Sequence, residues 1–310
     1  MQEVSVRPSR SAASGSMGAA GVVFMDGEYL PAPEARLSMF DSGFIMGANV
    51  FDTLAVWQGW LFKLNEHVDR FFRSAHAIRV ELPYSKEEFK AIVVETVRRA
   101  GVREAYVQCI ATRGIRAASL PTEWTPTVVV YSVPYIWAVG GPEGTEKGMR
   151  VIIARTRNLP IEVLDPKIKS FNRLNGYMAK LEAIDAGADE VVLLDTRGFL
   201  AEGRGANVFL VRDRALYTPS EDVLWGITRD TVFQIAGELG LKAEHGWFTP
   251  YDLYCADEAF FCTTAGGIAP IVEVDRRKVG DGRPGPITHQ VAERYWQMHV
   301  DPRYALQVIS

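Results

Sequence analysis

The sequence predicts an α+β protein built from two domains, and three observations lead to that prediction. Short apolar runs separated by glycine turns predict antiparallel strands, and helices with one apolar face follow such strands twice along the chain. A glycine-rich break at residues 140–144 separates the two series. With 310 residues, 47% of them hydrophobic and 23% charged, the chain has a globular composition and the length of one large domain or two moderate ones.

The hairpins of the first series are indicated by their turns. One turns at Asp26-Gly27 after the apolar run 22–24, and the next turns at Gln58-Gly59 within residues 54–64. Two extended runs, over residues 105–112 and 127–136, are predicted to be further strands.

Two helices are predicted between these strands. Asn65 is the expected N-cap of the first helix, whose apolar residues recur with helical spacing from Val68 to Ile78. The second helix opens with Ser85 and Glu88 at the spacing of a capping box. Gly101 is expected to end it.

The second series repeats this organisation after the break. Apolar residues in register from Leu174 to Ile184 predict a helix that ends at Gly187, and a further helix is expected to begin at Ile227-Thr228 and to end at Gly240. The predicted strands cover residues 151–154, 190–194, 208–211, 215–217 and 258–262.

The composition also excludes several classes of protein. A formal net charge of −4 gives no general attraction to nucleic acid, and no apolar run reaches the ~18 residues of a membrane helix, so we expect neither partner. Cys109, Cys255 and Cys262 are too few and too badly spaced for a disulfide framework or a metal cage. Residues 1–20 lack the apolar stretch of a signal peptide, so we expect a flexible tail on a cytoplasmic protein.

Lys167 and Lys169 stand at the end of an extended segment that leads into a helix. Lysines in such a place are usually solvated. A lysine in a partly dry cleft could instead keep a neutral amine and form a Schiff base. The residues alone leave both interpretations open.

Glu202 precedes a Gly-Arg-Gly sequence that interrupts a regular strand. A carboxylate there is commonly part of a surface turn. A buried one would need a cationic or donor partner, because an uncompensated buried charge is costly. A protonated pyridine nitrogen would be such a partner.

Three further stretches are typical of an anion site. Ile227-Thr228 lies at a predicted helix N-terminus, where free amides and the helix dipole favour a phosphate. Thr263-Thr264 opens a glycine-rich turn with hydroxyls and exposed amides. Arg70 lies on the first helix among apolar residues. A helix cap, a β-turn and a surface arginine are the ordinary alternatives.

Taken together, these stretches resemble the fold-type IV (class IV) aminotransferases that use pyridoxal 5'-phosphate (PLP). This group contains branched-chain, D-amino-acid and (R)-amine aminotransferases. The resemblance runs from about residue 21 to about residue 304, and its marks are residues 40–44, 65–70, 165–170, 201–209, 226–229 and 263–270.

The resemblance implies a two-domain fold similar to that of D-amino-acid aminotransferase. Residues 21–139 would form a smaller N-terminal α/β domain, residues 140–148 an interdomain linker, and residues 149–310 a larger C-terminal pseudo-barrel domain that binds the cofactor. It also implies a homodimer or larger homo-oligomer, with an amino donor and an α-keto acid as the small-molecule partners and no metal.

By resemblance, Lys169 and not Lys167 is the Schiff-base lysine, because it directly precedes the run Ser-Phe-Asn. Glu202 is similar to the carboxylate that pairs with the pyridine nitrogen of PLP in this family. The phosphate would be held by Arg70, Ile227, Thr228, Thr263 and Thr264.

The substrate pocket resembles more than one branch of the family. Tyr106 fits a Tyr-x-Arg element of branched-chain enzymes, but Gln108 replaces its arginine, and Arg113 or Arg116 is then expected to supply a mobile cation for the carboxylate. Residues 262–267 and 295–299 are closer to (R)-amine transaminases. The remaining candidate substrate contacts are Phe44, Phe51 and Ala265.

We therefore expect an aminotransferase whose donors are branched-chain or aliphatic L-amino acids, (R)-primary amines, or both. The alternatives are a lyase of the same fold, similar to aminodeoxychorismate lyase, and a D-amino-acid transaminase. A homologue that holds the cofactor without turnover is the alternative outside catalysis.

Overall fold

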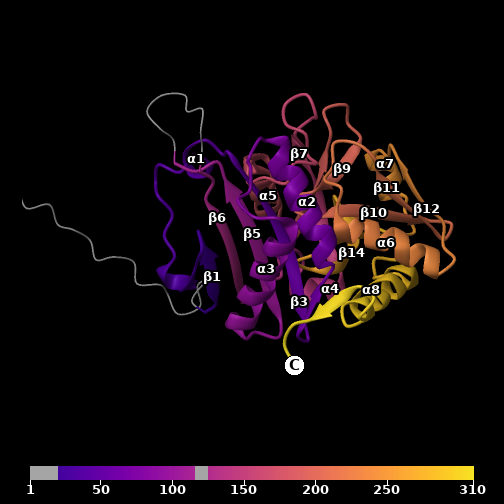
Figure 1. Ribbon diagram of the computed structural model, residues 1–310. Helices are drawn as coiled ribbons and strands as arrows, with labels where there is room; N and C mark the ends of the chain where they lie inside the picture. Colours follow the sequence, from indigo (N-terminus) through magenta and orange to yellow (C-terminus); the bar gives the residue numbers. More distant parts are fainter. Residues whose placement is uncertain (1–19, 116–124) are drawn as a thin grey trace, which may run out of the picture.

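A computed structural model describes residues 20–115 and 125–310 of the chain. Two sheets lie beside each other, the first built mainly from the first half of the sequence and the second from the later half (Figure 1). Apart from Ala20, the expected tail over residues 1–20 lies outside the described residues, and so does Arg116. Within the described ranges, no helix is long and apolar enough to cross a membrane.

The strands of the first sheet are β1 (Val22–Met25), β2 (Glu28–Pro31), β3 (Asn49–Trp57), β4 (Trp60–Phe62), β5 (Ala105–Thr112), β6 (Val128–Pro134) and β16 (Ala305–Gln307). Those of the second are β7 (Met149–Arg157), β8 (Glu190–Leu194), β9 (Leu200–Gly203), β10 (Asn207–Arg212), β11 (Ala215–Pro219), β12 (Ala243–Gly246), β13 (Glu258–Thr263), β14 (Gly267–Val274) and β15 (Arg277–Lys278).

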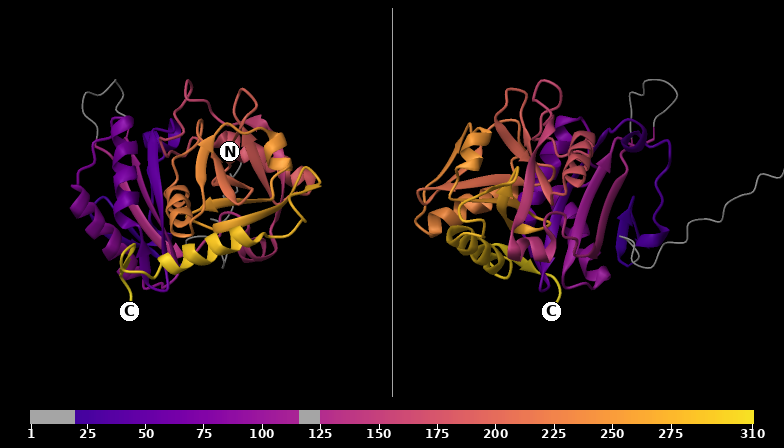
Figure 2. Two further views of the ribbon diagram at one scale, coloured as in Figure 1. Left: turned by 90° about the vertical axis from the view of Figure 1, so that its right-hand side faces the viewer. Right: turned by 180° about the vertical axis from the view of Figure 1, so that it is seen from behind.

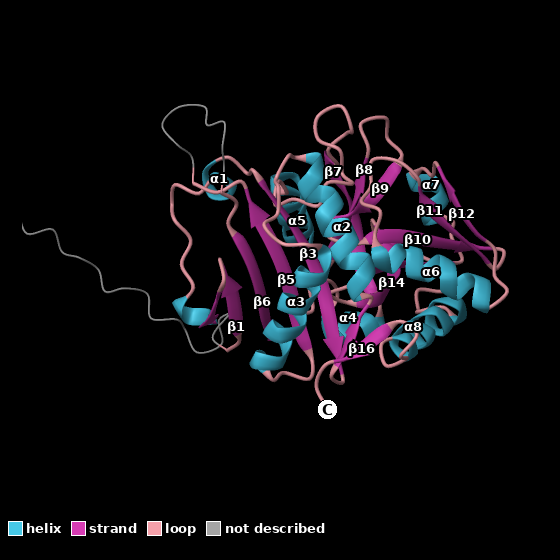
Figure 3. Cartoon of the chain, in the orientation of Figure 1, coloured by secondary structure: helices cyan, strands magenta, loops and turns pink. Residues whose placement is uncertain are grey.

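The helices are α1 (Ser42–Ile45), α2 (Leu64–Ala77), α3 (Lys86–Ala100), α4 (Gly141–Lys147), α5 (Leu174–Ala186), α6 (Ile227–Glu238), α7 (Pro250–Tyr254) and α8 (Pro286–Met298), with a short 3-10 turn over Ala32–Glu34. Figure 3 shows their distribution around the two sheets.

The first sheet has the order β16-β4-β3-β5-β6-β1-β2. Both predicted hairpins are confirmed, because β1 pairs with β2 across Asp26-Gly27 and β3 pairs with β4 across Gln58-Gly59. One strand falls outside the expected division of the chain. β16 pairs with β4, so the last residues of the expected C-terminal domain return to the first sheet.

Helices α2 and α3 cover one face of the first sheet, with Phe71 and Phe89 stacked 5.0 Å apart between them. The capping box of Ser85 and Glu88 and the left-handed Gly101 are confirmed. The predicted N-cap of α2 is wrong, because the helix begins at Leu64 with Lys63 as its N-cap. The Lys63 amide donates to the Tyr304 carbonyl at 2.9 Å, so a contact with the C-terminal segment holds the residue where the helix starts.

The second sheet closes on itself. Its order is β12-β11-β10-β13-β14-β7-β8-β9, and β9 also pairs with β10 through Glu202 and Asn207. Strands β10, β13, β14, β7, β8 and β9 therefore form a ring filled by apolar side chains, which confirms the predicted pseudo-barrel. Helices α6 and α8 pack on its outer surface (Figure 2).

The glycine-rich break contains a short helix. Helix α4 starts after Gly140 (φ 73°) and stops at Gly148 (φ 82°), with Pro142 in its first turn. Proline is compatible with a first helical turn because its missing N–H has no partner there, and glycine adopts the positive φ at each end without strain.

Helix α5 forms where the spacing of its apolar residues predicted a helix, but those residues do not pack on the barrel. Leu174, Tyr177 and Ile184 are 72%, 61% and 59% exposed. The face that packs on β7 and β8 carries Ala179 and Ala183 instead. Small residues on this face let the helix lie close to the strands.

Candidate active site

One pocket, with an empty volume of ≈ 880 Å³ that includes its open mouth, is lined by residues from both sheets. Phe51 of β3 and Arg70 of α2 line it from the first half, and Lys169, Glu202 and Thr228 line it from the second. Loop 158–173, between β7 and α5, contributes much of the wall.

Lys169 is held in this pocket by its backbone. The Phe51 amide donates to the Lys169 carbonyl at 2.8 Å, and the Lys169 amide donates to Ser74 Oγ at 3.3 Å. Its Nζ lies 4.7 Å from the centre of the Phe51 ring. Burial, together with Arg70 and Arg173, lowers the pKa of Lys169 to about 7.

Lys167 lies on the surface instead, where it forms an ion pair with Asp165 at 3.0 Å. The structure therefore brings only one lysine of the pair into the pocket. Lys167 lies in a turn, in which the Ile168 amide donates to the Asp165 carbonyl at 2.9 Å, and this turn directs the two side chains differently.

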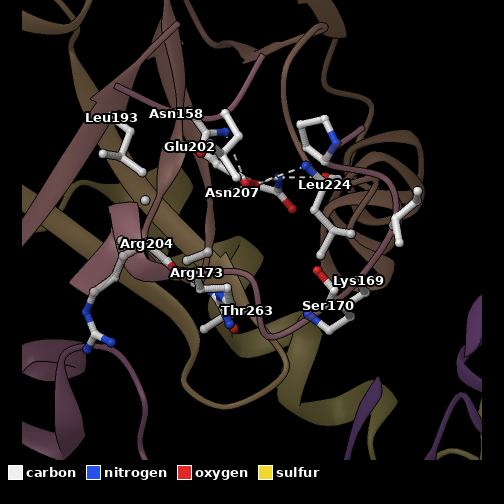
Figure 4. A pocket seen from close by; sticks show the side chains of 18 of the residues that line it. Asn158, Lys169, Ser170, Arg173, Leu193, Glu202, Arg204, Asn207, Leu224 and Thr263 are labelled. Atoms are coloured by element: carbon white, nitrogen blue, oxygen red, sulfur yellow. Dashed lines mark hydrogen bonds between the residues drawn. The ribbon is translucent and has the colours of Figure 1, made fainter. Parts of the chain in front are cut away.

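Glu202 enters the same pocket from β9, between Asn158 and Asn207 (Figure 4). Its Oε2 accepts hydrogen bonds from Asn207 Nδ2 at 3.2 Å and from the Leu224 amide at 3.1 Å. A longer contact of 3.5 Å joins Asn158 Nδ2 to Oε1. Burial raises the pKa of Glu202, although the Leu224 amide and the charges of Arg173 and Lys169 oppose that rise. Neither cation is within ion-pair distance of the carboxylate. The carboxylate is thus held by neutral donors and is suited to a cationic ligand.

Arg70 reaches the pocket from α2 and is fixed by Asp52. Its Nε and Nη2 donate to the two Asp52 oxygens, both at 2.8 Å, and its Nη1 donates to the Trp225 carbonyl at 3.2 Å. His67 Nδ1 lies 2.7 Å from Asp52 Oδ1. Burial alone would raise the pKa of Asp52, but Arg70 and His67 hold it well below its usual range.

Asp52 was not singled out as a site residue from the sequence. It is the charged residue in the otherwise apolar or neutral strand 49–57, and this charge in a buried strand was the available signal.

The residues predicted to form an anion site come together at the start of α6. Ile227 and Thr228 occupy its first turn, where backbone amides lack helical partners. Thr228 Oγ1 lies 3.5 Å from Oγ1 of Thr264, which follows β13. Both threonines line the pocket together with Ile227, Thr263 and Arg70. This group of five is called the anion cup below.

Of the predicted substrate contacts, Phe51 lines the pocket itself. Tyr106 and Gln108 lie on β5 near it: Gln108 Nε2 donates to the Tyr106 hydroxyl at 2.9 Å, and Tyr131 donates to Gln108 Oε1 at 2.5 Å. Both ends of the Gln108 amide are thus engaged by neutral groups.

The other predicted contacts lie farther out. Ala265 is buried in the turn after β13, and Phe44 on α1 is 69% exposed. Arg113 follows β5, and its amide donates to the Ala48 carbonyl at 3.0 Å. None of these three lines the pocket itself.

A pocket that combines an amine of lowered pKa, a carboxylate held by neutral donors and an anion cup can bind a molecule with complementary groups and move a proton within it. Comparison with known proteins bears on which molecule this is.

The class IV amino-transferase family model matches residues 49–274. The chain is 33% identical over 284 residues to a branched-chain-amino-acid aminotransferase of Pseudomonas aeruginosa, covering 90% of this chain and 92% of that one. It is 31% identical over 279 residues to a D-alanine aminotransferase of Staphylococcus haemolyticus, covering 88% and 96%.

A solved branched-chain amino acid aminotransferase from Thermobaculum terrenum, in its PLP-bound holo form, superposes with a TM-score of 0.85 and 29% identity, over 95% of this chain and 100% of that one. The match of family model, relatives and fold over most of the chain shows that this protein belongs to the class IV aminotransferases.

Proposed function

We propose that this protein is a PLP-dependent aminotransferase that transfers the amino group of a branched-chain or other aliphatic L-amino acid to an α-keto acid. The observation that carries the proposal is the Lys169 amine, with its pKa lowered to about 7, in one pocket with Glu202 and the anion cup. The protein's membership of the class IV family and its sequence identity of 33% to a branched-chain enzyme support the same activity.

The residues of the pocket fit the chemistry of PLP. The cofactor has an aldehyde, a ring nitrogen and a phosphate, and the pocket offers an amine, a carboxylate without a cationic partner and the anion cup.

In this assignment, each group of the pocket has one task. When bound, PLP supplies a ring that absorbs the electron pair left by a broken Cα–H bond. Glu202 keeps the ring nitrogen protonated by pairing with its positive charge. Arg70 and Thr228 bind the phosphate and so fix the orientation of the ring.

Lys169 then acts as the acid–base group. Because its pKa is lowered to about 7, a large fraction of the amine is neutral near neutral pH. The neutral Nζ can accept the proton that leaves the donor Cα, and the resulting ammonium can return a proton at the end of the transfer.

The position of Gln108 bears on the choice of donor. Its amide is engaged by Tyr131 and Tyr106, so this position offers no cation to a substrate carboxylate. An (R)-primary amine has no carboxylate to bind, and it stays in the proposal as a donor in addition to L-amino acids. D-Alanine is the second candidate, because the chain is 31% identical to a D-alanine aminotransferase.

An absorbance half-reaction on the PLP-loaded protein tests these assignments. L-leucine, D-alanine and (R)-1-phenylethylamine are added separately without a keto acid, and loss of the visible cofactor band identifies each donor. We expect loss with L-leucine. No loss with any of the three would contradict the proposal. Release of pyruvate from aminodeoxychorismate, added in a separate assay, would indicate the lyase.

We also propose that the protein is a homodimer. Exposed apolar side chains lie on and next to α1 and α5. They include Met39, Phe40, Phe44, Ile45, Met46, Phe171, Leu174, Tyr177, Met178, Leu181 and Ile184. The two groups meet where Asn172 Nδ2 donates to the Gly47 carbonyl at 2.9 Å. Contiguous apolar surface of this kind is typical of an interface.

Light scattering during size exclusion tests the dimer, with twice the chain mass of 34.4 kDa expected. Tyr177→Glu places a charge in the apolar surface and should give monomers. Tyr251→Glu, on α7, changes a tyrosine of similar exposure elsewhere and is the control. A wild-type mass of one chain would contradict this proposal.

We further propose that the protein is cytoplasmic, which cell fractionation would test.

A further inference from the structure

Arg70 is the guanidinium of the anion cup, and most of its hydrogen-bonding capacity is already used. An arginine has five N–H donors. Nε and one N–H of Nη2 bond to Asp52, and one N–H of Nη1 bonds to the Trp225 carbonyl. Nη1 and Nη2 therefore each keep one N–H that bonds to no described residue.

The free N–H of Nη2 lies on the edge that Nη2 shares with Nη1, because Asp52 bonds to the Nε side of the planar guanidinium. The Asp52 carboxylate occupies the neighbouring edge in a bidentate pair, which fixes the plane of the group as well as its position. The edge formed by Nη1 and Nη2 is the geometry in which arginine binds two oxygens of a phosphate.

Asp52 is itself held firmly. It is fully buried in β3, and its Oδ1 is also bonded to His67 Nδ1 at 2.7 Å and to the Thr53 amide at 2.8 Å. Burial lowers the pKa of His67, which favours the neutral ring with one N–H directed at Asp52. Both carboxylate oxygens thus have partners, and the carboxylate has little freedom to turn.

Arg70 also joins the two halves of the molecule. It is carried by α2, over the first sheet, and bonds to the Trp225 carbonyl just before α6, which packs on the barrel (Figure 1). Its side chain is 7% exposed.

We propose that Asp52, with His67 behind it, is a positioning residue for the cofactor phosphate, since it aims the free edge of Arg70 into the anion cup. This inference rests on the proposed PLP site. Asp52 acts through Arg70 and is not a catalytic residue.

Two effects of Asp52 oppose each other, which makes the proposal testable. Its negative charge, held close to Arg70, weakens the attraction of the cup for a phosphate through space. Its geometry strengthens that attraction by holding the guanidinium in place. In Asp52→Asn the amide offers one acceptor and sets an NH₂ group against an arginine N–H, so the bidentate pair is lost while the charge is also removed.

The experiment compares binding of PLP with binding of pyridoxal, which has no phosphate. For Asp52→Asn we expect the Kd of PLP to rise by about tenfold to a hundredfold, the range for losing a charge-assisted contact, with the Kd of pyridoxal unchanged. Glu258→Gln is the matched control, because Glu258 is a buried carboxylate that caps α8 outside the pocket. It should change neither Kd.

The other outcomes overturn the proposal. Tighter PLP binding by Asp52→Asn would make the aspartate a charge-balancing residue, and an equal loss for both ligands would make it a residue of the general fold. An unchanged Kd of PLP would remove any role in the site. If the wild-type protein binds neither ligand, the proposed PLP site itself fails, which is a separate result.

A double variant covers the case in which Asp52→Asn does not fold. Arg70→Gln removes the cation and leaves Asp52 uncompensated, whereas Asp52→Asn combined with Arg70→Gln restores a neutral pair. If Asp52 acts through Arg70, removing it from the Arg70→Gln protein should not weaken PLP binding further, and the loss of its negative charge should leave the Kd of PLP equal or lower. Weaker binding by the double variant than by Arg70→Gln would contradict the proposal.

Discussion

The lowered pKa of Lys169 makes a quantitative prediction about stability. In the cofactor-free folded protein its pKa is about 7, compared with 10.5 in an ordinary environment. Between these pH values the unfolded chain binds a proton that the folded protein lacks, so the free energy of unfolding rises with pH, by about 1.4 kcal/mol for each pH unit. Below pH 7 both states are protonated and the full penalty is present.

Lys169→Met removes this titration while keeping a side chain of similar length. Over the interval from pH 6 to pH 9, the wild type should gain about 3 kcal/mol of stability relative to the variant, because two pH units above 7 contribute. Urea denaturation of both cofactor-free proteins at the two pH values measures the difference in the free energy of unfolding. Groups that titrate in both proteins contribute equally to each, so the difference reports on Lys169.

Lys167→Met is the matched control, since Lys167 lies two residues away on the surface, paired with Asp165. Its stability should follow that of the wild type at both pH values. A difference between wild type and Lys169→Met that stays constant within about 0.5 kcal/mol from pH 6 to pH 9 would refute the reasoning. Lys169 would then be an ordinary ammonium, and its proposed role as a neutral base near pH 7 would be rejected.

Three further predictions concern catalysis and folding. Lys169→Ala should lower kcat by about 10²–10⁴-fold while PLP stays bound through the anion cup, and full multiple-turnover activity would overturn the assignment. Glu202→Gln should slow the half-reaction with L-leucine about a hundredfold in stopped-flow absorbance, because a neutral amide stabilises the ring nitrogen charge less; an unchanged rate would remove Glu202 from the site. Ser85→Ala should lower the free energy of unfolding by about 1 kcal/mol in urea, since the amide of Glu88 loses its cap, and no change would contradict the importance of the capping box.

Local signals predicted most of the elements and several of their ends. The hairpin turns at Asp26-Gly27 and Gln58-Gly59 and the capping box at Ser85 depend on residues adjacent in sequence, and all three are confirmed. The start of α2 depends instead on a bond between Lys63 and Tyr304, far apart in the chain. No local pattern contains that information, and the prediction of Asn65 as the cap was wrong for this reason.

The same division holds for the pocket. The sequence by itself singled out the residues that are proposed to carry the chemistry, and the structure places Lys169, Glu202 and the anion cup in one pocket. Asp52 was missed because its partners Arg70 and His67 become neighbours only when α2 packs against β3.

The tertiary structure alone decided the outward face of α5 and the electrostatics of the pocket. A helix with apolar residues on one side and alanines on the other can pack with either side, and the close approach of β7 and β8 selects the alanines. The pKa of Lys169 likewise depends on burial and on Arg70 and Arg173, which the fold brings close to it. Motifs specify which groups are present, whereas packing specifies their distances and their access to water, and these set their charge.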